Sequence, residues 1–404
     1  MKALLKILLS AAILFHFSCI EEYSISSKQN INEHNAIVIQ GQIFSGEKSK
    51  IYISKTEPLN SVEQPEPISN AKVYVIGENG YKSEIAQYDT DGKLYLIDTE
   101  TLPNNTSYAI LVNVNGEVFQ SDFLTLQNTP EIDNLTYKEK EDGVSIHIST
   151  HNTHNESRYY MWAYEEDWEF HAPIDFLGIK GIPVYNKILY NRDIINGHNP
   201  YLYCWKHTNS SNIFIYETEN LQENAVKDVE LIKIPINDIR ISYIYSILVK
   251  QFCLDKNAYN YYKTLELYTE KNNSLFTPMP NELRGNVKCT SNAQIKVYGY
   301  VLASNIKTKR IFIYASDFKE IYPEYEDNQC IFLIPDDKDN SWYHSWSEMV
   351  DKSGAIVMTT NGSFSPFSNT EYLDSKLYSR ECVDCRTVKG STKQRPDFWP
   401  NNHE

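Results

Sequence analysis

The stretch Tyr-Ala-Ile-Leu-Val-Asn-Val-Asn-Gly-Glu-Val-Phe-Gln-Ser-Asp-Phe-Leu, residues 108–124, decides the fold class of this chain. Two runs rich in β-branched and aromatic residues, Tyr108–Val114 and Val118–Leu124, flank the dipeptide Asn115-Gly116. Asn-Gly between such runs is the strongest short signal for a β-hairpin, because both residues of the tight turn need positive φ. The stretch therefore predicts two antiparallel strands.

Short runs of the same kind surround this hairpin and predict a small N-terminal β-sandwich over residues 35–128. Turn residues separate the runs at spacings that suit short strands, and Pro58 to Pro67 reads as a loop. We expect an Ig-like or carboxypeptidase-regulatory-like architecture. The runs are Ile37-Val38-Ile39, Ile51-Tyr52-Ile53, Lys72–Ile76 before Glu78-Asn79-Gly80, and Leu94–Ile97 after Asp91-Gly92.

A second β-sandwich is predicted over residues 129–404, beginning at Thr129-Pro130. In the run Val144–Ser149 the apolar residues alternate with Ser145, His147 and Ser149, which predicts a strand with one buried face. The run Tyr159–Tyr164 continues the pattern, and we expect long insertions between Glu165 and Asn220. The fold class is therefore mainly β.

One α-helix is predicted near residues 255–272. Asp255 can cap it, and Ala258, Tyr261 and Leu265 recur at helical spacing. Pro278 and Pro280 follow its end. The tail after Tyr378 is irregular, basic and aromatic-ended, and it contains cysteines.

The amino terminus predicts a signal peptide over residues 1–18 and a lipid-modified Cys19. Lys2 and Lys6 precede an apolar stretch that is too short to span a bilayer, and small Ser18 then precedes the cysteine. The alternative is an ordinary signal peptide that leaves Cys19 as a thiol. Residues 19–34 read as the modified cysteine and a polar, flexible tether. The acidic pair Glu21-Glu22 is typical of surface-export signals, although an acidic tether would look the same.

Composition limits the classes of partner. The formal net charge of −15 argues against a nucleic-acid-binding protein, which would need a basic stripe, and disfavours docking on anionic lipids. Membrane attachment is therefore expected through the N-terminal lipid, where two or three acyl chains anchor firmly. No cofactor and no metal is expected, because the His and Cys residues show no convincing ligand spacing.

Six cysteines remain if Cys19 carries lipid, and an even number in an exported chain favours disulfides. The sequence leaves all 15 possible pairings open, which is the number of ways to pair six thiols. Cys382 and Cys385 form a C-x-x-C motif, for which structural bridging is the preferred interpretation. The candidates are Cys204, Cys253, Cys289, Cys330, Cys382 and Cys385.

The densest set of titratable side chains is Glu165-Glu166-Asp167-Trp168-Glu169 with His171. A glycosidase needs two carboxylates that face each other across a sugar, and neighbours on one strand alternate sides. We therefore prefer a solvated acidic edge that discourages strand association. Trp162 and Trp168 are candidates for a sugar platform, with core packing preferred, and the His151/His154 pair indicates no specific chemistry. No catalytic triad is nominated, and we expect a non-enzymatic protein.

Together, a set of segments resembles the Bacteroidota outer-membrane lipoproteins that contain domain of unknown function 4249. The resemblance extends over most of the mature chain. Its segments are Val38–Gly41, Ser69–Val73, Tyr159–Trp162, Glu166–Glu169, Cys204-Trp205, Leu248–Gln251, Leu283–Asn286 with Cys289, Cys382–Arg386 and Lys393–Pro400.

The resemblance implies an accessory subunit of a TonB-dependent outer-membrane transporter and carries over no catalytic residues. Our leading hypothesis is a non-enzymatic, lipid-anchored outer-membrane protein, facing the cell surface, that aids nutrient capture or uptake. One alternative is a structural component of an outer-membrane assembly or secretion complex. The other is a surface glycan-active enzyme.

Overall fold

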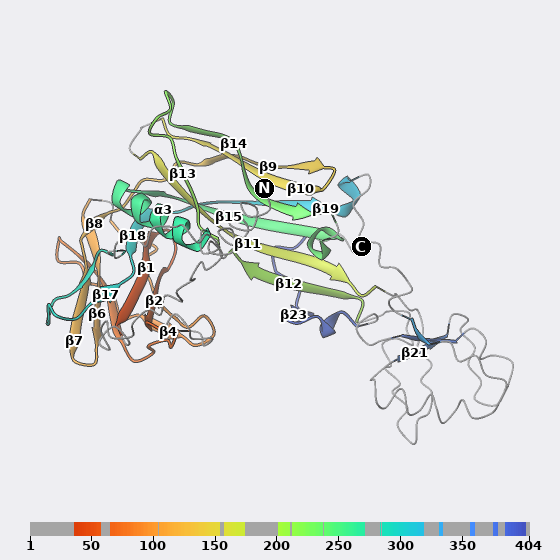
Figure 1. Ribbon diagram of the computed structural model, residues 1–404, viewed down its shortest axis with the longest axis horizontal. Helices are drawn as coiled ribbons and strands as arrows, with labels where there is room; N and C mark the ends of the chain where they lie inside the picture. Colours follow the sequence, from red (N-terminus) through yellow and green to blue (C-terminus); the bar gives the residue numbers. More distant parts are fainter. Residues whose placement is uncertain are drawn as a thin grey trace, which may run out of the picture.

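The computed structural model describes residues 36–57, 65–103, 105–153, 157–173, 201–210, 212–236, 238–270, 283, 285–318, 331–333, 356–359, 375–378 and 384–400. Two β-sandwiches lie side by side, which confirms the mainly β fold class (Figure 1). Several predictions lie outside the described residues: the signal peptide, Cys19 and its tether, Glu21, Glu22, His154, Cys330 and Cys382.

The first sandwich packs two sheets around an aliphatic core. One sheet has the order β17-β1-β2-β5-β4 with β18 also on β1, and the other has the order β16-β7-β6-β3 with β8 on β6. The first sheet contains β1 (Ile37–Ser45), β2 (Ser49–Lys55), β4 (Gln87–Asp89), β5 (Leu94–Ile97), β17 (Val297–Tyr298) and β18 (Val301–Asn305). The second contains β3 (Lys72–Gly77), β6 (Ser107–Val114), β7 (Glu117–Ser121), β8 (Leu124–Thr125) and β16 (Val287–Cys289).

The predicted Asn-Gly hairpin is present. Strands β6 and β7 are antiparallel, with Val114 opposite Glu117 across the turn. Asn115 and Gly116 have φ of 52° and 84°, the conformation that this two-residue turn requires. The local sequence therefore fixes the register of these two strands.

The predicted assignment of all residues 129–404 to the second domain is wrong, because a later segment, with β16, β17 and β18, completes the first sandwich. Strands β17 and β18 pair in parallel with β1, and β16 pairs with β7. Val287, Val301 and Ala303 from this segment lie in the same core as Ile39 and Val73. Strand β1 would otherwise present an open edge, and apolar alternation alone does not indicate which distant strand covers it.

The second sandwich packs a three-stranded sheet, β14-β10-β9, against a larger sheet. The larger sheet has the order β19-β15-β11-β12-β23, with β13 also on β11. The small sheet contains β9 (Ile132–Lys140), β10 (Gly143–His151) and β14 (Ala225–Pro235). The larger sheet contains β11 (Tyr159–His171), β12 (Tyr203–Asn209), β13 (Phe214–Glu217), β15 (Ile244–Leu254), β19 (Lys307–Tyr314) and β23 (Ser391–Thr392).

The alternation predicted for Val144–Ser149 is confirmed, since Val144, Ile146 and Ile148 all lie in the core of the second sandwich. The expectation of only one buried face is wrong, because Ser145 and His147 on the opposite face are buried as well. The insertion predicted from Glu165 begins later, because β11 continues as one strand to His171. A small separate sheet contains β20 (Ile331–Leu333), β21 (Ile356–Thr359) and β22 (Ser375–Tyr378).

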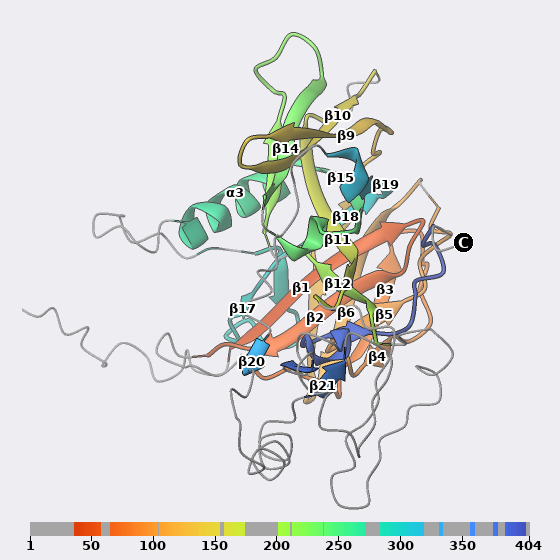
Figure 2. The ribbon, with the colours of Figure 1, turned by 90° about the vertical axis from the view of Figure 1, so that its right-hand side faces the viewer.

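The predicted helix is α3 (Lys256–Glu270), and Asp255 caps it by accepting a hydrogen bond from the Ala258 amide at 2.7 Å. The helix lies beside the junction of the two sandwiches (Figures 1 and 2). Its buried side chains pack with Phe44 and Leu302 of the first sandwich and with Phe252 of the second. A contiguous apolar cluster therefore joins the two sandwiches.

Candidate functional site

The acidic cluster lies on β11, in the middle of the larger sheet between β15 and β12. Glu166, Asp167 and Glu169 are only 4%, 5% and 0% exposed. The predicted solvated edge is therefore wrong, because strands flank the cluster on both sides. Since side chains alternate along a strand, Glu165, Asp167 and Glu169 share the outer face and Glu166 faces the core.

Glu165 forms an ion pair that reaches across the two sandwiches. Lys250 Nζ lies 3.0 Å from a Glu165 oxygen and 3.1 Å from a Glu47 oxygen of the first sandwich. Burial raises the pKa of Glu165, but the hydrogen bond and charge of Lys250 outweigh that effect, so the pKa lies below its ordinary value. The pair stays charged and ties β11 to the turn after β1.

Glu166 sits on the core side and is held by two donors. Arg240 Nη1 donates to it at 2.7 Å and the Tyr245 hydroxyl at 2.8 Å. Arg240 also binds both oxygens of Asp238, from Nε at 3.0 Å and from Nη2 at 2.7 Å. Burial, followed by the charge of Glu166, holds the pKa of Tyr245 well above its ordinary value, so the hydroxyl remains a donor. Arg240 lies in the short 3₁₀ helix η2 (Ile239–Ile241) that precedes β15.

Asp167 pairs with one side chain of β12, the strand next to β11, and with one of β19, two strands away. His207 Nδ1 of β12 lies 2.7 Å from one oxygen, and Arg310 Nη1 of β19 lies 3.0 Å from the other. Arg310 Nη1 also donates to the Ser246 hydroxyl at 2.7 Å. These contacts connect four adjacent strands across the outer face.

Glu169 is the most deeply buried member of the row. His171 Nε2 lies 3.2 Å from one oxygen, and the indole Nε1 of Trp399 donates to the other at 2.9 Å. Trp399 belongs to residues 384–400, which we call the strap. The strap therefore covers the carboxylate with a ring from the far end of the chain.

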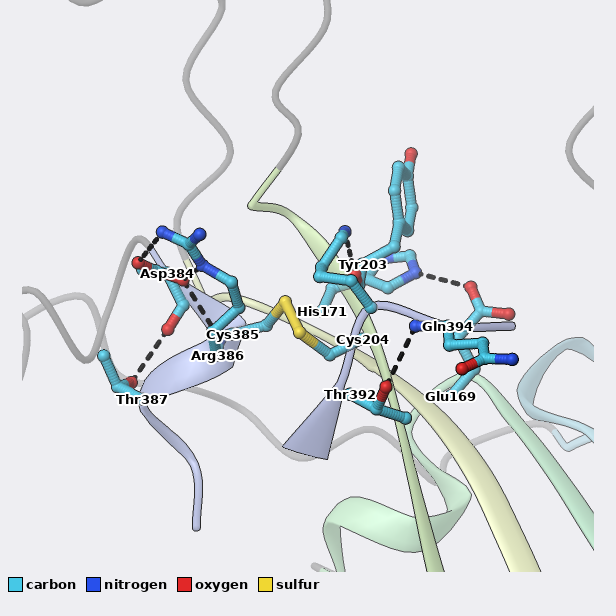
Figure 3. The surroundings of a disulfide bond; sticks show 11 residues. Glu169, His171, Tyr203, Cys204, Asp384, Cys385, Arg386, Thr387, Thr392 and Gln394 are labelled. Atoms are coloured by element: carbon cyan, nitrogen blue, oxygen red, sulfur yellow. Dashed lines mark hydrogen bonds and ion pairs between the residues drawn. A yellow bond between two sulfur atoms is a disulfide. The ribbon is translucent and has the colours of Figure 1, made fainter. Parts of the chain in front are cut away.

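Three attachments hold the strap against the larger sheet. A disulfide joins Cys385 to Cys204 of β12, and β23 pairs with β12 through Trp205 opposite Thr392 (Figure 3). Trp399 packs against Trp205 and Ile244. Beside it, the Arg310 guanidinium lies 3.7 Å from the centre of the Phe398 ring. The tail that looked irregular in sequence is thus a fixed covering of the sheet.

The disulfide prediction holds for two cysteines and needs correction for two. Cys204 and Cys385 are bonded. Cys253 and Cys289 are buried thiols. They cannot bridge each other without rearrangement, because Cys253 lies in the core of the second sandwich and Cys289 in that of the first.

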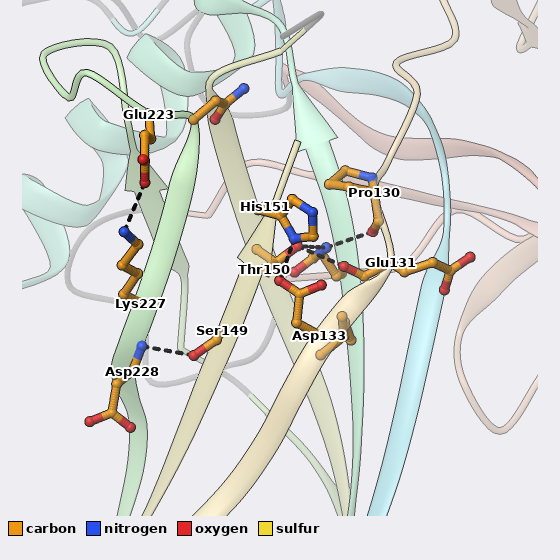
Figure 4. A network of polar contacts seen from close by, with 12 residues as sticks. Pro130, Glu131, Asp133, Ser149, Thr150, His151, Glu223, Lys227 and Asp228 are labelled. Atoms are coloured by element: carbon orange, nitrogen blue, oxygen red, sulfur yellow. Dashed lines mark hydrogen bonds and ion pairs between the residues drawn. The ribbon is translucent and has the colours of Figure 1, made fainter. Parts of the chain in front are cut away.

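The two tryptophans considered as a sugar platform lie in the protein core. Trp162 and Trp168 are buried in the second sandwich, which agrees with the core packing preferred from the sequence. Trp162 Nε1 donates a hydrogen bond to Gln251 at 2.8 Å. His151 contacts Asp133 at 2.7 Å on neighbouring strands (Figure 4). Its partner in the predicted pair, His154, is outside the described residues.

Ser145, His147 and Asp228, which were not singled out as a site from the sequence, are arranged like a catalytic triad. Ser145 Oγ lies 2.9 Å from His147 Nε2, and His147 Nδ1 lies 3.4 Å from an Asp228 carboxylate oxygen. Ser145 is fully buried in the middle of β10, where its backbone belongs to a ladder between two strands. A nucleophile needs access to its substrate and nearby oxyanion donors. The hydrogen bonds therefore fit a cross-strand polar cluster.

Within the described ranges, no group of three or more His, Cys, Asp or Glu side chains is arranged to hold a metal ion. Sequence reasoning missed the basic partners of the carboxylates because they come from elements distant in sequence. These partners are Lys250, Arg240, His207 and Arg310. Sequence reasoning also missed Trp399, for which an aromatic-ended tail was the available signal. The carboxylates of β11 therefore form a network of ion pairs and hydrogen bonds that holds four strands and the strap together.

A family model described as Domain of unknown function (DUF4249) matches residues 20–310. The match covers well over half of the chain, so the protein belongs to this family. No curated protein matches the sequence. Among the described residues, no helix is both long and apolar enough to cross a bilayer.

Proposed function

We propose that this chain is a non-enzymatic outer-membrane lipoprotein, anchored through Cys19, that serves as an accessory subunit of a TonB-dependent transporter. The observation that carries the proposal is the short charged and apolar leader that ends at Ser18-Cys19. Membership of the family supports it, through the partners that the resemblance implies. The acidic pair Glu21-Glu22 supports a surface-facing orientation.

The arrangement of the body is compatible with a tethered subunit. The described chain begins at Ala36, so the 16 residues 20–35 (35 − 20 + 1) separate Cys19 from the first sandwich. A chain of that length spans at most about 55 Å when extended. The body can therefore reach a barrel in the same membrane. The saturated carboxylates of β11 support a binding role over a catalytic one, since each is already engaged by a donor of this chain.

Replacing Cys19 with Ala tests the anchor. We expect the variant to leave the membrane fraction, because its acyl chains supply the attachment. Glu21→Gln with Glu22→Gln is the matched control, which should stay in the membrane but become protected when intact cells are shaved with protease. Membrane retention of the Cys19→Ala protein at the wild-type level would contradict the proposal.

Deletion of the gene tests the transport role. We expect loss of growth on one nutrient and normal growth on others. Broad envelope defects on every medium would instead indicate an assembly component. Hydrolysis by purified protein on a glycan panel, lost on replacement of Glu165 or Asp167, would indicate an enzyme.

A further inference from the structure

The outer face around the strap differs in charge from the rest of the molecule. Residues 384–400 carry four cationic and two acidic side chains, a net charge of +2. The whole chain has −15, so the remainder carries −15 − 2 = −17. Within the strap, Lys389 and Lys393 are exposed, and Asp384 is buried and paired with Arg386 at 2.8 Å. The strap therefore presents positive charge on an acidic protein.

Two exposed aromatic rings lie in the strap or close to it. Phe398 is 44% exposed and Tyr243 is 40% exposed, although each has a large apolar ring. Lys393 Nζ donates to the Tyr203 carbonyl, which places this cation beside an aromatic residue of β12. We call the set Tyr203, Tyr243, Lys389, Lys393 and Phe398 the strap face.

A continuous series of contacts joins the three aromatic residues of the strap face. The Tyr243 ring lies 3.5 Å from the His171 ring, which in turn lies 4.3 Å from Tyr203, centre to centre. His171 binds Glu169, Glu169 binds Trp399, and the Trp399 ring lies 6.2 Å from Phe398. Figure 3 shows His171 between Glu169 and Tyr203, close to the disulfide that fixes the strap. The exposed rings therefore have rigid support.

We propose that the strap face is a docking surface for an acidic patch on a protein partner. Rigid aromatic anchors with neighbouring cations are the composition of energetically important interface centres. The partner's acidic side chains would complement Lys389 and Lys393, and its apolar groups would cover Phe398 and Tyr243. An anionic lipid surface fits less well, because the remaining charge of −17 would be repelled by it.

The proposal rests on the proposed function for the identity of the partner, which is the outer-membrane barrel. Charge complementarity predicts that association is faster and tighter at low ionic strength. It also predicts that the barrel surface in contact with the strap is acidic.

Site-specific photo-crosslinking in intact cells tests the docking surface. A photoreactive amino acid is placed at Phe398, at Tyr243, or at Tyr52, which is 45% exposed on β2 of the first sandwich and serves as the matched control. We expect crosslinks to the barrel from Phe398 and Tyr243 at about ten times the yield from Tyr52, as for central against non-interface positions. Equal yields at all three positions, or crosslinks from the strap face to polysaccharide or lipid, would overturn the inference.

The same experiment separates the two proposals. Co-purification of a barrel with the wild-type chain while the strap face forms no crosslink to it would overturn the docking surface and leave the proposed function standing. Absence of any barrel from the wild-type preparation would overturn both.

A charge reversal provides a second readout that does not depend on the crosslinker. Lys389→Glu should reduce barrel recovery about threefold at low salt, and less at high salt where rim charges are screened. Lys72→Glu, at an exposed position of β3 in the first sandwich, makes the same charge change and should leave recovery unaltered. Equal losses for the two variants would contradict the inference. Thermal unfolding and thiol titration of each variant verify that the fold and the disulfide are intact.

Discussion

The two sandwiches differ in the kinds of side chain that they bury. The first buries aliphatic side chains and small hydroxyl residues, such as Ser49 and Thr99, whose hydroxyl oxygens lie 2.6 Å apart. The second buries charge: the four buried carboxylates in the described part of the chain, Glu166, Asp167, Glu169 and Asp384, belong to its strands or the strap. It also carries the disulfide. The core of the first sandwich is therefore stabilised by apolar packing, whereas the second sandwich is also held by buried ion pairs and a disulfide.

The largest loss of stability is expected from a substitution that disrupts close backbone packing in the first sandwich. Gly299 has φ of 99°, and a Cβ there would overlap the Ile39 carbonyl oxygen of β1. We expect Gly299→Ala to destabilise the protein by more than about 4 kcal/mol, because backbone atoms cannot yield as a flexible side chain can. Gly80→Ala is the control: φ is 86° with nothing near the added Cβ, so the cost should be about 1 kcal/mol. Chemical denaturation of both variants measures the difference.

The next largest loss of stability is expected from removing a buried charge in the second sandwich. Glu166→Ala leaves Arg240 and the buried Tyr245 hydroxyl without this acceptor, and we expect a loss of about 3–5 kcal/mol. Glu66→Ala removes an exposed carboxylate that pairs with Lys55 in the first sandwich, and should cost no more than about 1 kcal/mol. Similar costs for the two variants would remove the contrast between the sandwiches.

The strap provides an intermediate effect. Cys204→Ser opens a crosslink between residues 181 apart in sequence, and we expect a loss of about 2–5 kcal/mol. Limited trypsin digestion should then cleave at Lys389 and Lys393 first. Cys289→Ser changes a buried thiol of the first sandwich and should leave the strap resistant. Early cleavage in both variants would show that the disulfide does not hold the strap.

The smallest effect is the response to acid. The folded pKa of Glu165 lies below 4.5 and that of Asp238 below 3.8. Burial raises both pKa values, but the hydrogen bonds and charges of Lys250 and Arg240 outweigh that effect. Each carboxyl therefore contributes stability above its ordinary pKa that is lost as the pH falls through the folded pKa. Stability should decline below about pH 4.5, and Glu165→Gln should flatten the decline. An unchanged pH profile in that variant would contradict the assignment.

The separation in sequence of the interacting residues explains what could be predicted from the sequence. The Asn115-Gly116 turn and the Asp255 cap were predictable because each depends on residues within a few positions. The parallel pairing of β17 and β18 with β1 was not, because any apolar strand could satisfy the same pattern.

The candidate site was predictable only in part, for the same reason. The carboxylates of β11 are visible in sequence, but their burial depends on Arg240 and Arg310, which lie 74 and 143 residues from their acceptors. Cys385 was a candidate for bridging, but its partner Cys204 could not be chosen among the open pairings. Composition shows that such charges and thiols exist, whereas the topology decides which of them meet.

The most direct test of the proposed function is affinity purification of the tagged native chain from detergent-solubilised outer membranes at low salt, followed by quantitative mass spectrometry. We predict a TonB-dependent barrel in near-equal molar amount, and its loss when Phe398 and Tyr243 are both replaced by Ala. Recovery of the wild-type chain without any barrel would contradict the proposed function.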